Sequence, residues 1–373
     1  MKIQLIEGPI SHKGTQTAVS VITVKQLSEV FKVDIYDPAV GRIGTSAGYQ
    51  RSPKPNRIKS LVERLKQGYV VATAILVNVR DTNDKLTFDS KGRSEVELPP
   101  ELWGKDGMHR AKAWIELYEN ADEYGLDQES VGQIKVNIVL YWGADIVEEV
   151  MTFFDVNNNA KSIPTGNRLE MDAYLTRHAP QHNGDPLLAE IDDIVHELGK
   201  TSQWADKIQW PNQPANVCPS SALMRSCLEI FGESSSIAGL SKEEKIALLT
   251  TVWEAIEVVF PEVFNSTDKK KYSLQKAIGV TVVHRLVPKI YVDILLENNK
   301  IFKQEDKINP ENVDIWITYF EKMRTYEDKN MNGQDVDGLK FWLSGKDGGA
   351  GAYSSGAGRN MISKIIGSLV LGR

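Results

Sequence analysis

A run of five residues in the first third of the chain combines several groups that bind phosphate. It reads Asp106-Gly107-Met108-His109-Arg110 and opens a segment whose apolar residues have helical spacing. The first N–H groups of a helix have no partner inside it, and the helix dipole favours an anion there. A glycine lets the backbone approach a phosphate closely, and Arg110 can hold one with two parallel hydrogen bonds. The run therefore predicts a phosphate site.

Asp106 adds a negative charge to a place that otherwise favours anions. Its carboxylate can cap the helix, hold Mg²⁺ or act as a base. A plainer interpretation stays open, in which the helix is capped and His109 and Arg110 simply lie on the surface. A run of five residues is too short to separate the two.

A basic patch lies further towards the N-terminus, although the chain has a net charge of -6. It follows Tyr49-Gln50-Arg51 and comprises Lys54, Arg57, Lys59, Arg64 and Lys66. Such a patch suits the phosphates of a nucleotide or of DNA. Arg51 precedes a predicted helix and is the favoured anion contact, whereas a solvated helix face is the simpler interpretation of Lys59 and Lys66.

Two further segments are candidates for binding. The first runs from Phe153 to Lys161 and carries three asparagines, whose amide side chains both donate and accept hydrogen bonds and suit a base or a ribose. Its alternative is a helix C-cap followed by a polar turn. The second is the Gly/Ser-rich segment 345–358, which lacks the glycine–lysine pattern of a phosphate loop. We expect a flexible loop between two elements there.

The elements that must position these residues follow from the spacing of apolar residues. Alternation predicts strands over 19–24 and 134–141, and an apolar run predicts a buried strand over 73–79. Helical spacing predicts helices over 58–65, 109–118, 146–154 and 166–177. Beyond Pro180 strand signals nearly vanish and long helical stretches follow, one of which Pro288 is expected to kink or split. These patterns predict an α+β protein, with an α/β domain over 1–165 and a mainly helical domain over 166–373.

Composition and charge argue against some classes of protein. The chain has 373 residues, of which 41% are hydrophobic and 25% charged, as in ordinary soluble proteins. Its negative charge argues against a protein that coats DNA, because such binding depends on lysine and arginine. No apolar run is long enough for a membrane span, the first residues lack the apolar core of a signal peptide, and Cys218 and Cys227 fit buried thiols. We therefore expect a cytoplasmic protein without a membrane partner.

Three segments together resemble one known family. The run 106–110 looks like the Asp-Gly-Gln-His-Arg signature of the DGQHR-domain proteins, with Met108 in place of the glutamine. Tyr49-Gln50-Arg51 and the block from Phe154 to Lys161 are similar to the family in order and spacing. The resemblance covers roughly residues 40–175. It is closest to DpdB-like members, which serve systems that place 7-deazaguanine bases in DNA.

The resemblance implies a ParB/sulfiredoxin-type fold, in which a nucleotide binds at the turn before a helix. It implies ATP and Mg²⁺ as cofactors, with Asp106 as the metal ligand, and it assigns catalysis to Asp106, His109 and Arg110. The implied nucleotide-binding residues are Gln50, Arg51, Asp106, Gly107, Met108, His109, Arg110, Asn157 and Lys161. Met108 offers no useful hydrogen bond, so any contact made by the family's glutamine side chain is missing here.

The implied activity is ATP hydrolysis by one component of a DNA-modification system. Its expected partners are a transglycosylase-like protein that exchanges the base and DNA, contacted directly or through that protein. Two alternatives stay open. One is a DNA-binding transcriptional regulator like the DndB members of DNA phosphorothioation systems, and the other is a ParB-like nuclease with Asp106 and a divalent metal at its centre.

Overall fold

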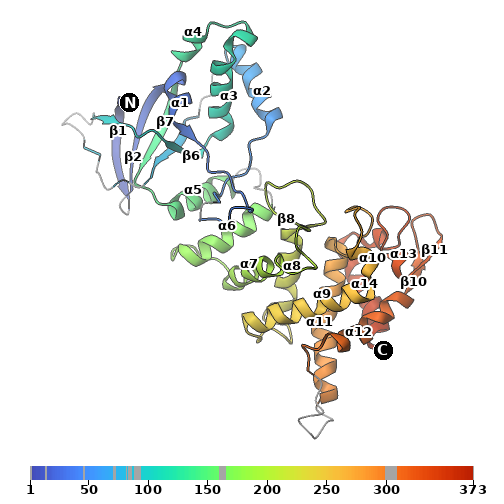
Figure 1. The fold of residues 1–373 in the computed structure, drawn as a ribbon. Coiled ribbons are helices and arrows are strands. Elements are labelled where there is room, and N and C mark those ends of the chain that lie inside the picture. The colour runs from blue at the N-terminus through green and yellow to red at the C-terminus, as the bar shows by residue number, and fades with distance from the viewer. Residues whose placement is uncertain are drawn as a thin grey trace. The chain divides into compact units, whose positions relative to one another are not determined.

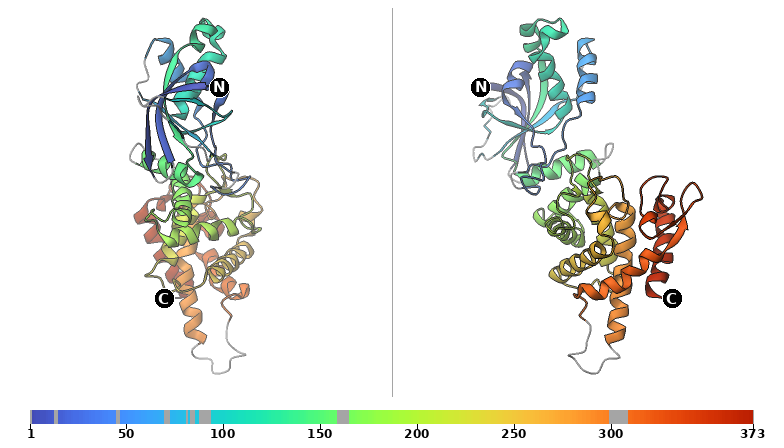
Figure 2. Two further views of the ribbon diagram at one scale, coloured as in Figure 1. Left: turned by 90° about the vertical axis from the view of Figure 1, so that its left-hand side faces the viewer. Right: turned by 45° about the vertical axis from the view of Figure 1, so that its right-hand side comes forward.

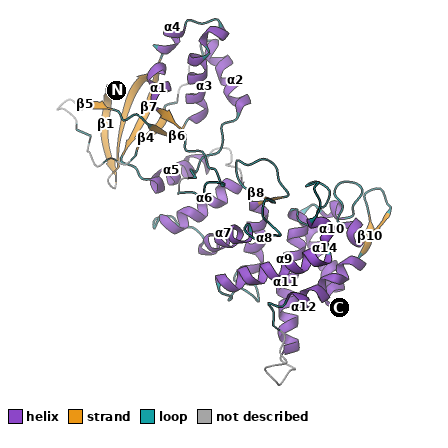
Figure 3. Ribbon diagram, in the orientation of Figure 1, coloured by secondary structure: helices purple, strands orange, loops and turns teal. Residues whose placement is uncertain are grey.

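The chain forms two compact units in a computed structural model, Met1–Asn183 and Gly184–Arg373. The structure describes residues 2–12, 15–44, 47–69, 73–80, 82, 86–87, 94–158, 165–298 and 309–372. Strands are concentrated in unit 1 and helices dominate unit 2 (Figure 3), so the protein is of the α+β class. The division lies beyond the predicted boundary at 165/166, because the helix after that boundary packs inside unit 1.

Unit 1 is built on a seven-stranded mixed sheet (Figure 1) with the order β3-β6-β4-β7-β2-β1-β5. Its strands are β1 (Lys2–His12), β2 (Thr15–Thr23), β3 (Phe31–Lys32), β4 (Ile75–Val79), β5 (Ser94–Glu97), β6 (Leu102–Asp106) and β7 (Lys135–Trp142). The pairs β3–β6 and β4–β7 are parallel and the others antiparallel. The long strand β1 was not predicted, and neither were the shorter strands β3, β5 and β6.

Six α-helices accompany this sheet in the part of unit 1 that the structure describes. They are α1 (Val24–Val30), α2 (Pro55–Lys66), α3 (Met108–Glu119), α4 (Gln128–Gly132), α5 (Ile146–Asn158) and α6 (Thr165–His178). A capping box at Thr23 ends β2 and starts α1, because its hydroxyl accepts from the Gln26 amide at 3.1 Å. Apolar residues of α1 and α3 pack on one face of the sheet, against alternate residues of β4 and β7. Helix α2 lies beside α3 (Figures 1 and 2).

A second apolar cluster joins α5, α6 and the segment around Tyr49. It contains Tyr49 and Phe153 together with Met171, Tyr174 and Leu175 of α6. This packing explains why α6 belongs to unit 1. A side chain at Gly44, where φ is +83°, would collide with the ring of Tyr174.

A polar network lies beneath α5, on the sheet face opposite α1 and α3. The buried carboxylate of Glu149 accepts hydrogen bonds from Arg80 at 2.6 and 2.8 Å, from Asn78 at 2.6 Å and from the Tyr49 hydroxyl at 3.2 Å. Arg80 also pairs with Asp34 at 2.7 Å. Burial alone lowers the pKa of Arg80, but its bonds to Glu149 and Asp34 outweigh burial and raise that pKa above its ordinary value. The network ties β4, α5 and the segment before Arg51 together.

Unit 2 is mainly helical. Its helices are α7 (Pro186–Leu198), α8 (Ser220–Phe231), α9 (Lys242–Val259), α10 (Pro261–Phe264), α11 (Ala277–Asn298), α12 (Val313–Phe320), α13 (Gly338–Phe341) and α14 (Gly356–Leu371). Two small sheets pair β8 (Ile208–Gln209) with β9 (Cys218–Pro219) and β10 (Glu327–Lys329) with β11 (Asp335–Asp337). None of the described helices combines the length and apolar character that a bilayer span requires.

Three sequence predictions fall in unit 2. Pro288 does not split its helix but lies inside α11, where buried apolar residues on both sides hold the helix together. Cys218 and Cys227 are buried free thiols, as predicted, and burial raises the pKa of both. The Gly/Ser-rich segment connects α13 to α14, so it lies between two elements as predicted, and it contains a short 3-10 helix, Ala350–Tyr353. Part of it is packed, since Gly349 is buried and a side chain there would meet the Phe341 ring at 2.5 Å.

The substitution E149Q tests the network beneath α5. Loss of one partner from a buried ion pair costs about 3 kcal/mol, so we expect amide hydrogen exchange in β4 to accelerate by the corresponding factor. The matched control is E29Q at an exposed position of α1, which should change protection by less than about 0.5 kcal/mol. Equal protection of β4 in the two variants would show that the network does not hold this face together.

Candidate functional site

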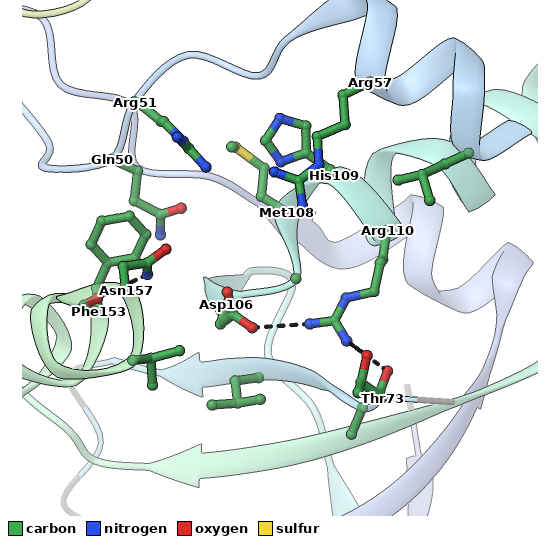
Figure 4. A pocket seen from close by; sticks show the side chains of 15 residues that line it. Gln50, Arg51, Arg57, Thr73, Asp106, Met108, His109, Arg110, Phe153 and Asn157 are labelled. Carbon is green, nitrogen blue, oxygen red and sulfur yellow. Dashed lines mark hydrogen bonds and ion pairs between the residues drawn. The ribbon is translucent and has the colours of Figure 1, made fainter. Parts of the chain in front are cut away.

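A cavity of about 780 Å³ in unit 1 brings the predicted binding segments together (Figure 4). Among the predicted residues, those that line it are Gln50, Arg51, Asp106, Gly107, Met108, His109, Arg110 and Asn157. Lys161 lies outside the described residues. Segments far apart in the sequence therefore meet at one place, at the end of β6 and the start of α3.

The strand–turn–helix at the centre of the site leaves backbone donors open. Strand β6 ends at Asp106, Gly107 is the N-cap residue with φ 88°, and α3 begins at Met108. No side chain caps this helix, and its first internal bond runs from the Ala111 amide to the Gly107 carbonyl at 2.9 Å. The Asp106 carboxylate therefore does not cap α3, which was one of the three roles considered for it from the sequence. The first N–H groups of α3 are available to an anion.

Arg110 folds back over the turn. Its Nη2 donates to the Asp106 carboxylate at 2.9 Å, and its Nη1 donates to the Thr73 carbonyl at 2.9 Å and to the Thr73 hydroxyl. Burial lowers the pKa of Arg110, and the charge of Asp106 partly restores it. Gly107 has a positive φ, which favours glycine, and a side chain there would lie 2.8 Å from Arg110 Nη2 and displace that group.

His109 is buried rather than exposed, which excludes the surface position considered from the sequence. Its Nε2 accepts a hydrogen bond from the Lys54 backbone amide at 3.1 Å, and this bond assigns the ring proton to Nδ1. Burial, followed by the positive charges of Arg57, Arg51 and Lys54, lowers the pKa of His109 to about 4. His109 is therefore neutral at pH 7 and holds the segment before α2 against the start of α3.

Arg51 and Arg57 are the uncompensated charges of the site. Neither guanidinium forms a hydrogen bond or ion pair with any residue that the structure describes, and both line the cavity (Figure 4). Burial and then the charge of Arg57 lower the pKa of Arg51, which Asp106 offsets only in part. With Arg110, three guanidinium groups face a single lining carboxylate. Like charges in a partly desolvated cavity repel one another, and a bound polyanion would relieve that repulsion.

The remaining wall of the cavity is apolar. It includes Leu61, Leu76, Phe153 and Val156. Phe153 is held edge-on against the Tyr49 ring, with centroids 5.6 Å apart. Such a surface suits the flat face of a nucleotide's base, while the arginines suit the phosphates of the same nucleotide.

The two predicted amide contacts differ in what they can offer a ligand. Gln50 is buried, and its Nε2 donates to the Tyr49 hydroxyl at 3.0 Å and to the Gly104 carbonyl, so it anchors the segment before Arg51 to β6. Asn157 donates Nδ2 to the Phe153 carbonyl at 2.8 Å. Its Oδ1 is the atom left to accept a bond from a ligand.

Several lining residues were missed as binding residues. Arg57 was assigned only to the basic patch, although its spacing from Leu61 places both on one face of α2. Phe153 lies four residues before Asn157 in α5, so the same helical spacing places these two residues on one face. Thr73 offered none, because its contact with Arg110 joins residues far apart in the sequence.

Asp106 can serve as a ligand for Mg²⁺ that arrives with a nucleotide. One of its oxygens pairs with Arg110, while Oδ1 makes no hydrogen bond to a described residue, and the side chain is 32% exposed. Mg²⁺ in such sites takes one or two carboxylates and completes its shell with phosphate oxygens and water. Within the described ranges no three His, Cys, Asp or Glu residues are grouped so that they could hold a metal ion by themselves.

The pKa of His109 gives a direct test of this geometry. Because the folded value of about 4 lies below the ordinary value of about 6.5, the unfolded chain takes up the proton first. The fold therefore loses stability as the pH falls from about 6.5 towards 4. We expect the NMR titration of the His109 ring, assigned with H109Q, to show no midpoint above pH 5, consistent with that pKa. A midpoint near the ordinary value would contradict the bond to Lys54.

Three comparisons with known proteins bear on the identity of the chain. No family model matches it, no curated protein matches it, and no solved structure matches it. The likeness to the DGQHR-domain proteins therefore rests on the quoted motifs alone. The geometry of the cavity is the basis on which a function can be argued.

Proposed function

We propose that unit 1 binds a nucleoside triphosphate, with ATP as the expected ligand. The proposal rests on two guanidinium groups, those of Arg51 and Arg57, which lie beside the uncapped start of α3 and have no ion-pair partner among the described residues. These groups supply charge and N–H donors for a chain of phosphates. The cavity of about 780 Å³ falls in the range of roughly 300–1,000 Å³ that small-molecule sites occupy.

The apolar wall supports a nucleotide rather than a simple phosphate. Phosphates on Arg51 and Arg57 leave the base to lie against Leu61 and Phe153, which line the same cavity. The Asn157 Oδ1 is then an acceptor for an amino group or a hydroxyl of the ligand.

We further propose that the bound nucleotide is hydrolysed. Mg²⁺ would supply Lewis-acid stabilisation of the phosphate oxygens. Asp106 would hold the ion through its open oxygen, and Arg110 would fix the orientation of that carboxylate. Arg51 and Arg57 would stabilise the negative charge that develops on the phosphates. The contacts of His109 favour positioning rather than proton transfer, because its Nε2 lone pair is already occupied.

The biological setting that we propose follows from the resemblance to the DGQHR-domain proteins. The chain would be the ATP-dependent component of a DNA-modification system, most similar to those that insert 7-deazaguanine. Its fold in unit 1 would be of the ParB/sulfiredoxin type, and its partner a transglycosylase-like protein acting on DNA. The support is that the motif residues from three segments line one cavity.

Two arginine substitutions test nucleotide binding. We expect R51Q and R57Q each to weaken ATP binding about tenfold or more, because each loses a charge-assisted hydrogen bond to phosphate. Isothermal titration calorimetry measures the affinity. The matched control is K59Q, which removes an exposed charge from the same helix outside the cavity and should leave the affinity unchanged. Equal losses in all three variants would point to a general charge effect, and no ATP binding by the folded wild type would refute the proposal.

A separate substitution tests hydrolysis. We expect D106N to bind ATP within a few-fold of the wild type but to lose about 100-fold or more of Mg²⁺-dependent phosphate release. The matched control is D122N, an exposed aspartate of unit 1 that lies outside the cavity. The assay should be run with and without duplex DNA. A wild type that binds ATP but releases no phosphate in either case would instead favour a DNA-binding regulator that senses the nucleotide.

A further inference from the structure

Unit 2 contains a second cavity with a basic lining. It has a volume of about 490 Å³ and is lined by residues of α8, α11 and α14, of which α11 packs on the other two. Two of its lining residues, Gly356 and Arg359, belong to the Gly/Ser-rich segment and its flank that were considered from the sequence, where the pattern of a phosphate loop is lacking. Its position in unit 2 makes it independent of the nucleotide site proposed above.

Three guanidinium groups and one carboxylate line this second cavity. Arg225 is exposed and forms no hydrogen bond or ion pair with any residue in the described ranges. Arg359 has a buried Nε without a hydrogen-bond acceptor in the part of unit 2 that the structure describes. Arg285 donates Nε to Glu229 at 2.6 Å, and that carboxylate is the only one in the lining. The cavity therefore keeps an excess of positive charge.

The starts of three long helices also border the cavity. Ser221 lies in the first turn of α8, Ala277 begins α11 and Gly356 begins α14. Helix α8 has no side-chain cap, so its first N–H groups stay open, whereas the Ser355 hydroxyl accepts from the Gly358 amide of α14 at 3.0 Å. Three helix dipoles with their positive ends at one cavity add to the field of the arginines.

We infer that this cavity binds a phosphate group through Arg225, Arg359 and the open amides of α8. Phosphate presents several acceptor oxygens and a charge that two planar guanidinium groups can bind in parallel. The Arg285–Glu229 pair borders the site and fixes one wall, which leaves the other two arginines for the ligand. The phosphate can belong either to a small phosphorylated molecule or to the backbone of a nucleic acid, and the chemistry of the site is the same for both.

The test uses the full chain in an R51Q/R57Q background, so that the cavity of unit 1 does not contribute. Inorganic pyrophosphate is titrated by calorimetry, and a short labelled DNA duplex is followed by fluorescence anisotropy. We expect R225Q/R359Q to bind at least one of the two probes about tenfold or more weakly than the background. If the probe is DNA, the salt dependence should also become shallower, since fewer phosphates are neutralised.

Two controls keep the result interpretable. Arg225 is exposed, so R225Q alone tests the site even if the change at the part-buried Arg359 impairs folding. K269Q removes an exposed positive charge of unit 2 outside the cavity and should have no effect. Loss with pyrophosphate identifies a small phosphorylated ligand, and loss with DNA alone identifies a nucleic-acid backbone. Failure of the background protein to bind either probe, or equal binding by R225Q, would overturn the inference whatever happens with ATP in unit 1.

Discussion

The buried carboxylate of Glu149 is the contact on which the site in unit 1 depends. A buried charge costs several kcal/mol unless it is paired and hydrogen-bonded, and here Arg80, Asn78 and Tyr49 all donate to it. Asn78 belongs to β4, Arg80 directly follows that strand and Tyr49 lies in the segment before Arg51, while Glu149 belongs to α5. The carboxylate of Glu149 therefore positions two parts of the site. One is the cavity wall that α5 forms, and the other is the segment that carries the arginines.

Positive charge is treated in opposite ways in the two polar parts of unit 1. In the network beneath α5, Arg80 has two carboxylates, Glu149 and Asp34, within 2.7 Å. Inside the cavity, Arg51 and Arg57 have none among the described residues, although Asp106 lies on the same lining. A buried cation that stabilises the fold is usually paired like Arg80. In the nucleotide site that we propose, the phosphates of the ligand would supply the negative charge for Arg51 and Arg57.

Local patterns predicted the parts of the site that lie close together in sequence. The turn at Gly107 and the helix after it follow from one glycine and from regular apolar spacing, and α3 was found within a residue of its start. Contacts between distant segments left no such signal. Two contacts of the site depend on how β6 and the segment before α2 meet. They are the hydrogen bond from the Lys54 amide to His109 and the hydrogen bond from the buried Gln50 side chain to the Tyr49 hydroxyl. Strand β1 was missed because its apolar alternation is weak and Pro9 interrupts it, and its pairing with β2 is irregular there.

The bond between His109 and Lys54 has a consequence for the stiffness of the binding loop. Residue 54 stands between Pro53 and Pro55, and proline has no backbone N–H. The stretch thus contains a single amide hydrogen, and His109 accepts it. Two prolines restrict the loop even in the unfolded chain, and the one remaining donor fastens it to α3. Arg51 and Arg57 are attached to this restricted segment, so its backbone would lose little conformational entropy on binding the ligand that we propose. This hydrogen bond comes from the backbone of residue 54, so any residue except proline can donate it.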